Sequence, residues 1–482
     1  MPASISGDGR DDANPGGASA PSRPNILLIV SDDHGYADRS ALGIDPEVRT
    51  PALDRLAAEG VGCDEAYVTA PVCSPSRAGL IAGAYQQRWG AHWFDDSSMA
   101  GPERPSLAER LRDVGYRTGY YGKVHYGAER EGDRGAPPQH GFDNSFYGLA
   151  GQSMGRLNYL RHSSAAVDEY GGAAKAMAVQ PMSAGGEPVE VERFLTDEIA
   201  DRAAAFIAAD DDRPFFAMVA FNAVHNFCWQ LPDEELEARG LPRFEDWYPG
   251  ASDYLDWYDG AISPNLANGR AYYLAQLELM DRQVGRLLDL LDEQGIGDDT
   301  IVVYTTDNGG SQCNYGLNTP LRGTKYTLYE GGIRVPFLVR WRAALPGGVV
   351  RDGLVSSMDI AATALAAAGG GLDGLDGRDL LAFLRGDGGP VRDELHWDCR
   401  WQWSVRQGRW KLAWVESGSP HAAEIRRVEH TEPGDGLRLV DLVADPSEQR
   451  DVQAEHPEVV AELTAARRRW RAEMDRSSVV PK

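Results

Sequence analysis

The chain has 482 residues, a formal net charge of −25 and an apolar fraction of 42%. This length exceeds what one hydrophobic core usually supports, and the apolar content excludes a chain that is disordered throughout. The acidic balance, without any Lys/Arg-rich block, argues against a nucleic-acid partner, and no apolar run approaches the roughly 20 residues that span a bilayer.

Residues 1–23 are rich in Gly, Pro, Ser and Asp, a composition that predicts a disordered arm. They lack the apolar centre of a secretory signal, so we expect a cytoplasmic protein. The five cysteines are odd in number and widely spaced, which argues against both a disulfide framework and a zinc knuckle.

Short apolar runs alternate with helical patterns from residue 24 onward. Strands are predicted over 25–30, 117–121, 214–221, 300–306 and 335–341, and helices over 51–60, 77–84, 106–115, 191–209 and 271–294. This alternation predicts an α/β domain with a central, mostly parallel mixed sheet flanked by helices.

The pattern changes after an Ala-rich and Gly-rich stretch that begins at residue 361. Residues 396–414 are typical of strands in a hairpin, and residues 455–473 predict a closing helix. We therefore divide the chain into a disordered arm (1–23), a large α/β domain (24–371) and a small α+β domain with an antiparallel sheet (372–482).

Acidic pairs follow two of the predicted strands. Asp32 and Asp33 come directly after residues 25–30, and Asp307 and Asn308 come after residues 300–306. Ligands of open α/β sheets bind outside the carboxyl ends of the strands, so both pairs are expected at one edge. Three carboxylates and an amide oxygen in one place indicate a hard cation such as Ca²⁺ or Mg²⁺, although Asp and Asn also follow strands simply as turn formers.

Cys73 stands in the sequence Cys-Ser-Pro-Ser-Arg at a predicted loop-to-helix junction. A helix N-terminus offers N–H groups to an anion, and Arg77 adds a planar cationic fork. Taken alone, Cys73 is more simply interpreted as a buried thiol. Further cations and histidines recur in loops after predicted strands, namely Lys123, His125, His225 and Lys325.

Together these segments resemble the type I sulfatases of the alkaline phosphatase superfamily. The similarity lies in CSPSRAGLIAG, DDHG, YGKVHYG, TTDNGG, GTKYTLYEGGIRVP and the closing DLVADPSEQRDV. It implies an alkaline phosphatase-like fold and hydrolysis of a sulfate ester. It also implies that a separate maturation enzyme oxidises Cys73 to Cα-formylglycine.

The resemblance also implies a role for each candidate residue. Asp32, Asp33, Asp307 and Asn308 would hold Ca²⁺, with Mg²⁺ as the alternative, together with modified Cys73. Arg77 and Lys123 would steady the formylglycine hydrate, and His125 would take its proton when sulfate is expelled. Lys325 and His225 would bind sulfate oxygens, with His225 protonating the leaving alcohol.

The chemistry agrees with this implication. A thiol would form a sulfate adduct with no easy route to release, whereas an aldehyde hydrate has one hydroxyl to attack sulfur and another to eject sulfate. Cationic donors around the group would stabilise the negative charge that develops on its oxygens.

The sequence leaves the leaving group and the oligomeric state open. A small sulfated sugar is the expected substrate, followed by an aryl or alkyl sulfate. Candidate pocket residues are His92, Trp93, residues 150–190 and residues 396–403, although the tryptophans of the last segment are expected to pack a core. The alternatives are a phosphonate or phosphate ester hydrolase of the same superfamily, and a non-catalytic binding homologue that leaves Cys73 unmodified.

Overall fold

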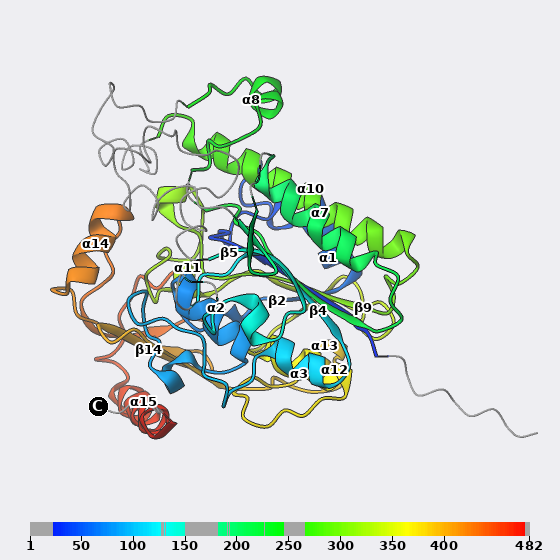
Figure 1. Cartoon of the computed structure of the whole chain (residues 1–482). Helices are drawn as coiled ribbons and strands as arrows, with labels where there is room; N and C mark the ends of the chain where they lie inside the picture. The colour runs from blue at the N-terminus through cyan, green and yellow to red at the C-terminus, as the bar shows by residue number, and fades with distance from the viewer. Residues whose placement is uncertain are drawn as a thin grey trace, which may run out of the picture.

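The computed structural model describes residues 23–126, 130, 132–149, 182–189, 191, 193–225, 227–244 and 266–477. A ten-stranded mixed sheet forms its centre, in the order β11-β2-β10-β9-β1-β8-β4-β5-β6-β7. A second, four-stranded sheet has the order β13-β14-β15-β16 and is antiparallel throughout. This arrangement confirms the predicted fold class (Figure 1).

The middle of the large sheet consists of parallel strands that are buried on both faces. They are β9 (Thr300–Thr306), β1 (Asn25–Ser31), β8 (Phe215–Ala220), β4 (Arg117–Lys123) and β5 (Asn144–Gly148). Alternate residues of β1 pack into different cores: Leu27 and Ile29 on one face, and Ile26 and Leu28 on the other. Burial on both faces explains why these strands have continuous apolar sequences rather than alternating ones.

Shorter strands extend the sheet at both edges. On one side they are β10 (Phe337–Arg340), which is antiparallel to β9, then β2 (Val61–Cys63) and β11 (Val349–Arg351); on the other they are β6 (Met182–Ala184) and β7 (Glu187–Val189). A separate pair is formed by β3 (Ala66–Tyr67) and β12 (Val355–Ser356).

Helices cover both faces of the large sheet (Figure 1). One face is covered by α1 (Pro51–Glu59), α7 (Leu195–Ile207) and α10 (Gly269–Glu293), with α8 (Asp233–Arg239) beside them. The other is covered by α2 (Cys73–Ala82), α3 (Leu107–Asp113), α12 (Asp359–Ala368) and α13 (Leu381–Arg385). Short helical turns lie at Ser40–Leu42 (η1), Gln86–Trp89 (η2), Pro137–His140 (η3), Gln312–Asn314 (η4) and Glu330–Ile333 (α11).

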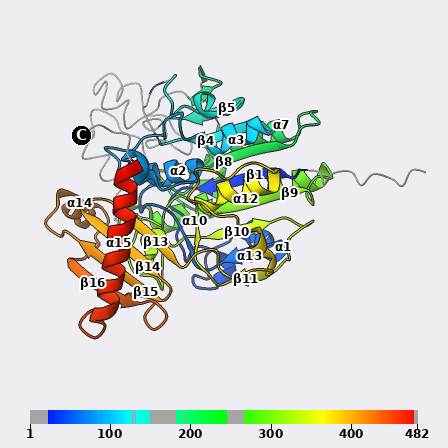
Figure 2. The ribbon, with the colours of Figure 1, turned by 90° about the horizontal axis from the view of Figure 1, so that it is seen from below.

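The small sheet consists of β13 (Glu394–Asp398), β14 (Gln402–Gln407), β15 (Trp410–Val415) and β16 (Gly436–Asp441). Helix α15 (Pro457–Ser477) lies along this sheet, as Figure 2 shows, and α14 (Pro420–Val428) follows β15. Trp397 and Trp401 pack with Tyr67 and Trp93 of the large unit, so the expectation that these two tryptophans serve a core is confirmed. No helix among the described residues is both long and apolar enough to cross a membrane.

One boundary bears directly on chemistry. The helix expected from residue 77 begins at Cys73 instead. Pro75 is therefore the third residue of α2, where proline is tolerated because the first N–H groups of a helix have no intrahelical acceptor. Cys73 becomes the first residue of the helix, directly after the loop.

Candidate active site

Strand register brings the two acidic pairs together. Ser31 at the end of β1 pairs with Thr306 at the end of β9, so Asp32 and Asp307 leave adjacent parallel strands at the same level. The backbone N–H of Asp33 donates to Oδ1 of Asp307 at 3.3 Å. Carboxylate oxygens of Asp32, Asp33 and Asp307 all lie within 4.8 Å of one another. The predicted convergence at one sheet edge is therefore present.

Three cationic side chains contact these three carboxylates. Lys123, the last residue of β4, donates to Asp32 at 2.5 Å, Arg77 donates to Asp307 at 2.7 Å, and Lys325 lies 2.8 Å from Asp33. All six side chains are at most 2% exposed. Charges buried this deeply must be compensated, and each carboxylate has its own partner.

Polar atoms without a partner remain inside this cluster. Oδ1 of Asp32 and Oδ1 of Asn308 are buried and accept no hydrogen bond from any residue that the structure describes. Asn308 is held by its amide nitrogen, which donates to Asp33 at 2.6 Å. Unpaired carboxylate and amide oxygens in one place are the donor set of a hard divalent cation, so the residues present fit such an ion.

The pKa values of the carboxyl groups also indicate that further positive charge would stabilise their ionised forms. Burial raises the pKa of Asp33 to about 7, and the neighbouring Asp32 and Asp307 carboxylates add to this effect against the Lys325 ammonium. Burial likewise raises the pKa of Asp307, despite Arg77. A divalent cation would favour the ionised form of both groups.

Cys73 lies at the same place, on the first turn of α2. Its Sγ is within 4.8 Å of ligand atoms of Asp32 and His225. The residue is 1% exposed, and burial raises the pKa of its thiol. An unmodified Cys73 is therefore a neutral thiol at pH 7 and a weak nucleophile.

Two histidines and Lys325 complete the site. Nε2 of His225 lies 3.1 Å from Nζ of Lys325 and 3.6 Å from Oδ2 of Asp33. Burial, together with nearby Lys and Arg side chains, lowers the pKa of both His225 and His125 well below the usual value. Both rings are thus neutral at pH 7, and each has a buried Nδ1 without a partner among the described residues.

Loops after different strands are fastened to one another around this centre. Asp32 exchanges backbone hydrogen bonds with Ala223 and Val224, which places the loop carrying His225 beside the end of β1. The N–H of Tyr326 donates to Pro71 at 2.7 Å, which places the loop carrying Lys325 beside the start of α2. The structure brings together all ten sequence-predicted residues, including His125 on the loop after β4.

Comparison with known proteins places this arrangement in a family. The family model described as "Sulfatase" matches residues 24–370. Steryl-sulfatase of Mus musculus is 31% identical over 94% of this chain and 83% of its own length, and arylsulfatase A of Homo sapiens is 31% identical over 91% and 86%. The chain belongs to the sulfatase family.

Structural comparison agrees with this assignment. The crystal structure of Ps i-CgsB in complex with k-i-k-neocarrahexaose is 26% identical, has a TM-score of 0.74 and covers 93% of each chain. The protein is therefore a sulfuric ester hydrolase, and use of a metal ion and a formylglycine is a general property of its family.

Two residues of the sulfatase site were not predicted. Nδ2 of Asn314 donates to Asp33 at 2.5 Å. Glu429, directly after α14, accepts hydrogen bonds from Ser311, the N–H of Gln312 and Thr324 at 2.5, 2.6 and 2.9 Å. Asn314 carries no motif beyond its closeness to residues 307–310, and Glu429 lies more than 100 positions from its partners, so neither had a sequence signal.

The candidate pocket residues have mixed outcomes. His92 is buried with Nδ1 3.1 Å from the carbonyl of Asp398, and Trp93 is 5% exposed within a core, so both serve packing between the large and small sheets. Residues 150–181 and 190 lie outside the described part of the chain. Phe94, next to these two, is half-buried and its ring stacks on that of His125, with centroids 5.9 Å apart.

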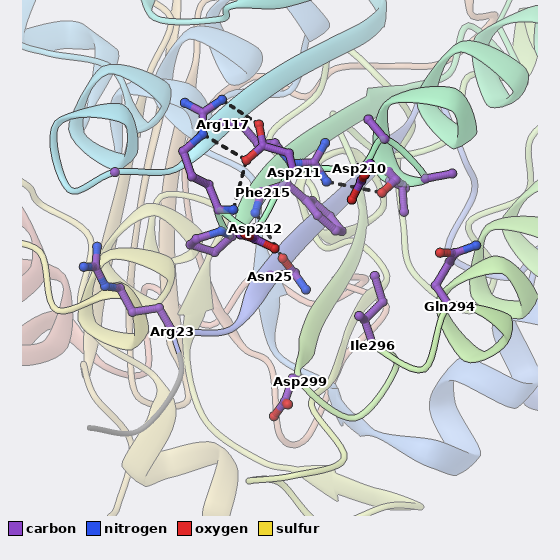
Figure 3. A pocket seen from close by; sticks show the side chains of 16 residues that line it. Arg23, Asn25, Arg117, Asp210, Asp211, Asp212, Phe215, Gln294, Ile296 and Asp299 are labelled. Atoms are coloured by element: carbon purple, nitrogen blue, oxygen red, sulfur yellow. Dashed lines mark hydrogen bonds and ion pairs between the residues drawn. The ribbon is translucent and has the colours of Figure 1, made fainter. Parts of the chain in front are cut away.

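A cavity of about 930 Å³ lies at the opposite end of the strands (Figure 3). It is lined at the amino ends of β1, β4 and β8 by Asn25, Arg117 and Phe215, together with the run 210–213. Arg213 pairs with Asp211 at 2.7 Å, and Arg117 donates to the carbonyl of Ile207 at 3.2 Å and lies over the Phe206 ring. Nε of Arg117 has no partner among the described residues, but the cavity lies at the amino ends of the strands, whereas ligands of open α/β sheets bind at the carboxyl ends.

Proposed function

We propose that this sulfatase hydrolyses the sulfate ester of a small carbohydrate, with residue 73 as the origin of the nucleophile and Ca²⁺ as the bound ion. The observation that carries the proposal is the convergence of Cys73, three carboxylates and three cationic side chains at one edge of the sheet. The sugar is supported by the carbohydrate complex of the structural relative Ps i-CgsB.

The modified residue and the ion supply the covalent chemistry. Oxidation of Cys73 would give the formylglycine aldehyde, and addition of water to it would give a hydrate with a hydroxyl able to attack sulfur. When bound, the cation would lower the pKa of that hydroxyl. Asp32, Asp33, Asp307 and Asn308 would hold the ion, because they provide only hard oxygen donors.

The remaining side chains act on protons and on the sulfate. Lys123 and Arg77 fix the positions of Asp32 and Asp307 and supply positive charge beside residue 73. Lys325 offers its ammonium to sulfate oxygens, where negative charge develops. His125 is neutral and can accept a proton from the second hydroxyl of the hydrate, the one that ejects sulfate.

His225 is the proposed proton donor to the leaving alcohol. In the free protein its pKa is lowered by burial and by Lys325, so it holds no extra proton at pH 7. A bound anionic sulfate ester offsets the Lys325 charge and favours the protonated ring. His225 therefore becomes able to act as a general acid only when the sulfate ester is bound.

A substrate panel on matured protein tests the proposal. The protein is co-expressed with a formylglycine-generating enzyme, and mass spectrometry of the tryptic peptide confirms conversion of Cys73. We expect kcat/KM for at least one monosulfated sugar to exceed that for aryl and linear alkyl sulfates and for phosphonate monoesters. A higher kcat/KM for a phosphonate, or for a linear alkyl sulfate, would refute the proposed substrate class.

Magnesium and calcium are compared in the same assay after chelation. The proposal expects Ca²⁺ to restore activity at a lower concentration than Mg²⁺, since Mg²⁺ usually retains several waters and uses few protein carboxylates. Restoration by Mg²⁺ alone would overturn the assignment of the ion.

A further inference from the structure

Two half-buried aromatic side chains contact His125, the proposed proton acceptor, and Lys325, the proposed ligand of sulfate oxygens. Phe94 stacks on His125 with an interplanar angle of 25°, and the Tyr326 ring lies 5.5 Å from Nζ of Lys325. The two rings also contact each other, with centroids 6.1 Å apart. His125 and Lys325 are at most 5% exposed, whereas Phe94 and Tyr326, which contact them, are partly exposed.

A row of further aromatic rings holds Phe94 and Tyr326 in place. Trp93 contacts Phe94, Tyr326 and Trp401 at centroid distances of 5.7, 6.2 and 5.6 Å. Trp401 lies in the turn between β13 and β14 and is 5% exposed, so the row is anchored in the core between the two sheets. Phe94 and Tyr326 are inclined by 62°, so these fixed rings offer an angled apolar surface with little loss of conformational entropy on binding.

His421 forms the outer end of the row. It is the second residue of α14 and contacts Trp93 at 5.5 Å and Trp401 at 5.9 Å. It is half-buried, and neither ring nitrogen is hydrogen-bonded to a residue that the structure describes. An imidazole of this kind can donate to or accept from a hydroxyl group.

One ion pair joins the loops beside the row. Arg400 and Asp96 form an ion pair at 2.5 Å between the two loops that carry Trp401 and Phe94. The row therefore offers apolar ring faces and one imidazole, without an unpaired Lys or Arg among its own described members. A leaving group bound here needs an apolar face with hydroxyls at its edge.

We infer that Phe94, Tyr326 and His421 form a leaving-group rim that selects a neutral pyranose ring attached to the sulfate. This inference rests on the proposed function, since it takes His125 and Lys325 as the groups next to the sulfate. The C–H face of the sugar packs on Phe94 and Tyr326, and a hydroxyl at its edge reaches His421. The small unit thus takes part in recognition through α14, although the sulfate chemistry belongs to the large sheet.

Three alanine variants test the rim in matured enzyme: Phe94→Ala, Tyr326→Ala and His421→Ala. For the best monosulfated pyranose of the panel, we expect Phe94→Ala and Tyr326→Ala each to raise KM about tenfold or more, because a ring contact of this size is lost. His421→Ala is expected to raise KM by a smaller factor. Inorganic sulfate probes only the buried polar groups next to the sulfate, such as His125 and Lys325. Its inhibition constant is expected to change less than about twofold.

Phe206→Ala is the matched control, because Phe206 is a half-buried aromatic residue stacked on Arg117 near the opposite end of the sheet. It is expected to leave the KM for the pyranose unchanged. A linear alkyl sulfate provides a second control: its KM is expected to be insensitive to all three rim variants.

The outcomes separate the rim from the proposed function. If the wild-type enzyme prefers a linear alkyl sulfate, the carbohydrate proposal fails and the rim fails with it. If the wild type cleaves a sulfated pyranose but Phe94→Ala and Tyr326→Ala retain its KM, only the rim is refuted. A matching loss of inorganic sulfate binding would also refute it, because the rings would then act by holding His125 and Lys325.

Discussion

The two ends of the central sheet contain similar residues in different states. At the carboxyl ends, three aspartates and three cations are buried, and Asp32 and Asn308 each keep an oxygen without a partner. At the amino ends, aspartates and arginines line an open cavity (Figure 3). Among them, Arg213 forms an ion pair with Asp211. Unpartnered oxygens that could ligate a cation, on Asp32 and Asn308, thus mark the functional end, whereas the cavity of about 930 Å³ lies at the other one.

The largest effect is expected from removing the proposed nucleophile at the carboxyl ends of the strands. Cys73→Ala removes the side chain from which formylglycine is proposed to form, so kcat is expected to fall about 10⁴-fold or more. The substitution removes one small buried atom, so the melting temperature is expected to change little. Circular dichroism and turnover of the best sulfate ester measure the two quantities, and near-normal turnover would place the nucleophile elsewhere.

The second prediction concerns pH and metal at the carboxyl end. In metal-free protein the pKa of Asp33 is raised from 3.8 to about 7, so the folded state keeps a proton that the unfolded chain has released. This contribution to stability is complete below about pH 3.8 and is lost as the pH rises through about 7. Calcium favours the ionised carboxyl, so it restores stability where the proton has left.

Thermal melts measure this linkage directly. The difference in melting temperature between saturating Ca²⁺ and chelator is expected to be larger at pH 8 than at pH 6, by a few degrees. Using the difference removes titrations that calcium does not influence. An equal or smaller difference at pH 8 would show that Asp33 and its neighbours do not bind the ion.

A moderate effect is expected at Glu429, which joins the small unit to the site. Glu429→Ala leaves the donors on Ser311, Gln312 and Thr324 without their acceptor, next to the loops that carry Asn308 and Lys325. We expect kcat to fall about tenfold and calcium affinity to weaken, with partial recovery in Glu429→Gln, which keeps one carbonyl acceptor.

Titration with Ca²⁺, monitored by calorimetry, distinguishes a role of Glu429 in positioning the site from simple stabilisation of the fold. If the folded Glu429→Ala protein binds Ca²⁺ and turns over substrate as the wild type does, then Glu429 serves only the packing of α14.

The smallest effect is expected at the amino end. Asp211→Ala removes the partner of Arg213 and widens the cavity, yet kcat/KM is expected to stay within about twofold of the wild type. A loss above tenfold would show that this end takes part in function, and the contrast between the two ends would no longer hold.

The sequence predicted the parts of the site that follow from strand periodicity. Residues 25–30 and 300–306 are apolar runs that end in acids, so the edge where Asp32 and Asp307 meet could be predicted before their register was known. The start of α2 was misplaced, because Pro75 resembles a loop residue unless its position in the first turn is known.

Long-range side-chain contacts were beyond sequence reasoning. Glu429 and the pairing of Phe94 with Tyr326 depend on how the small sheet docks, and neither has a periodic signal. Phe383 and Leu384 of helix α13, with Leu380 just before it, pack in the core of the large sheet, beyond the proposed boundary at 371. The division into domains and the cytoplasmic location remain predictions.

The position of the bound ion decides whether the carboxyl ends of the strands hold the metal. Crystals of matured protein soaked in Ca²⁺, with anomalous diffraction recorded, are expected to show one ion in contact with Asp32, Asp33, Asp307, Asn308 and residue 73. An ion bound instead at the 210–212 run, or no ion at the carboxyl ends at saturating Ca²⁺, would contradict the account.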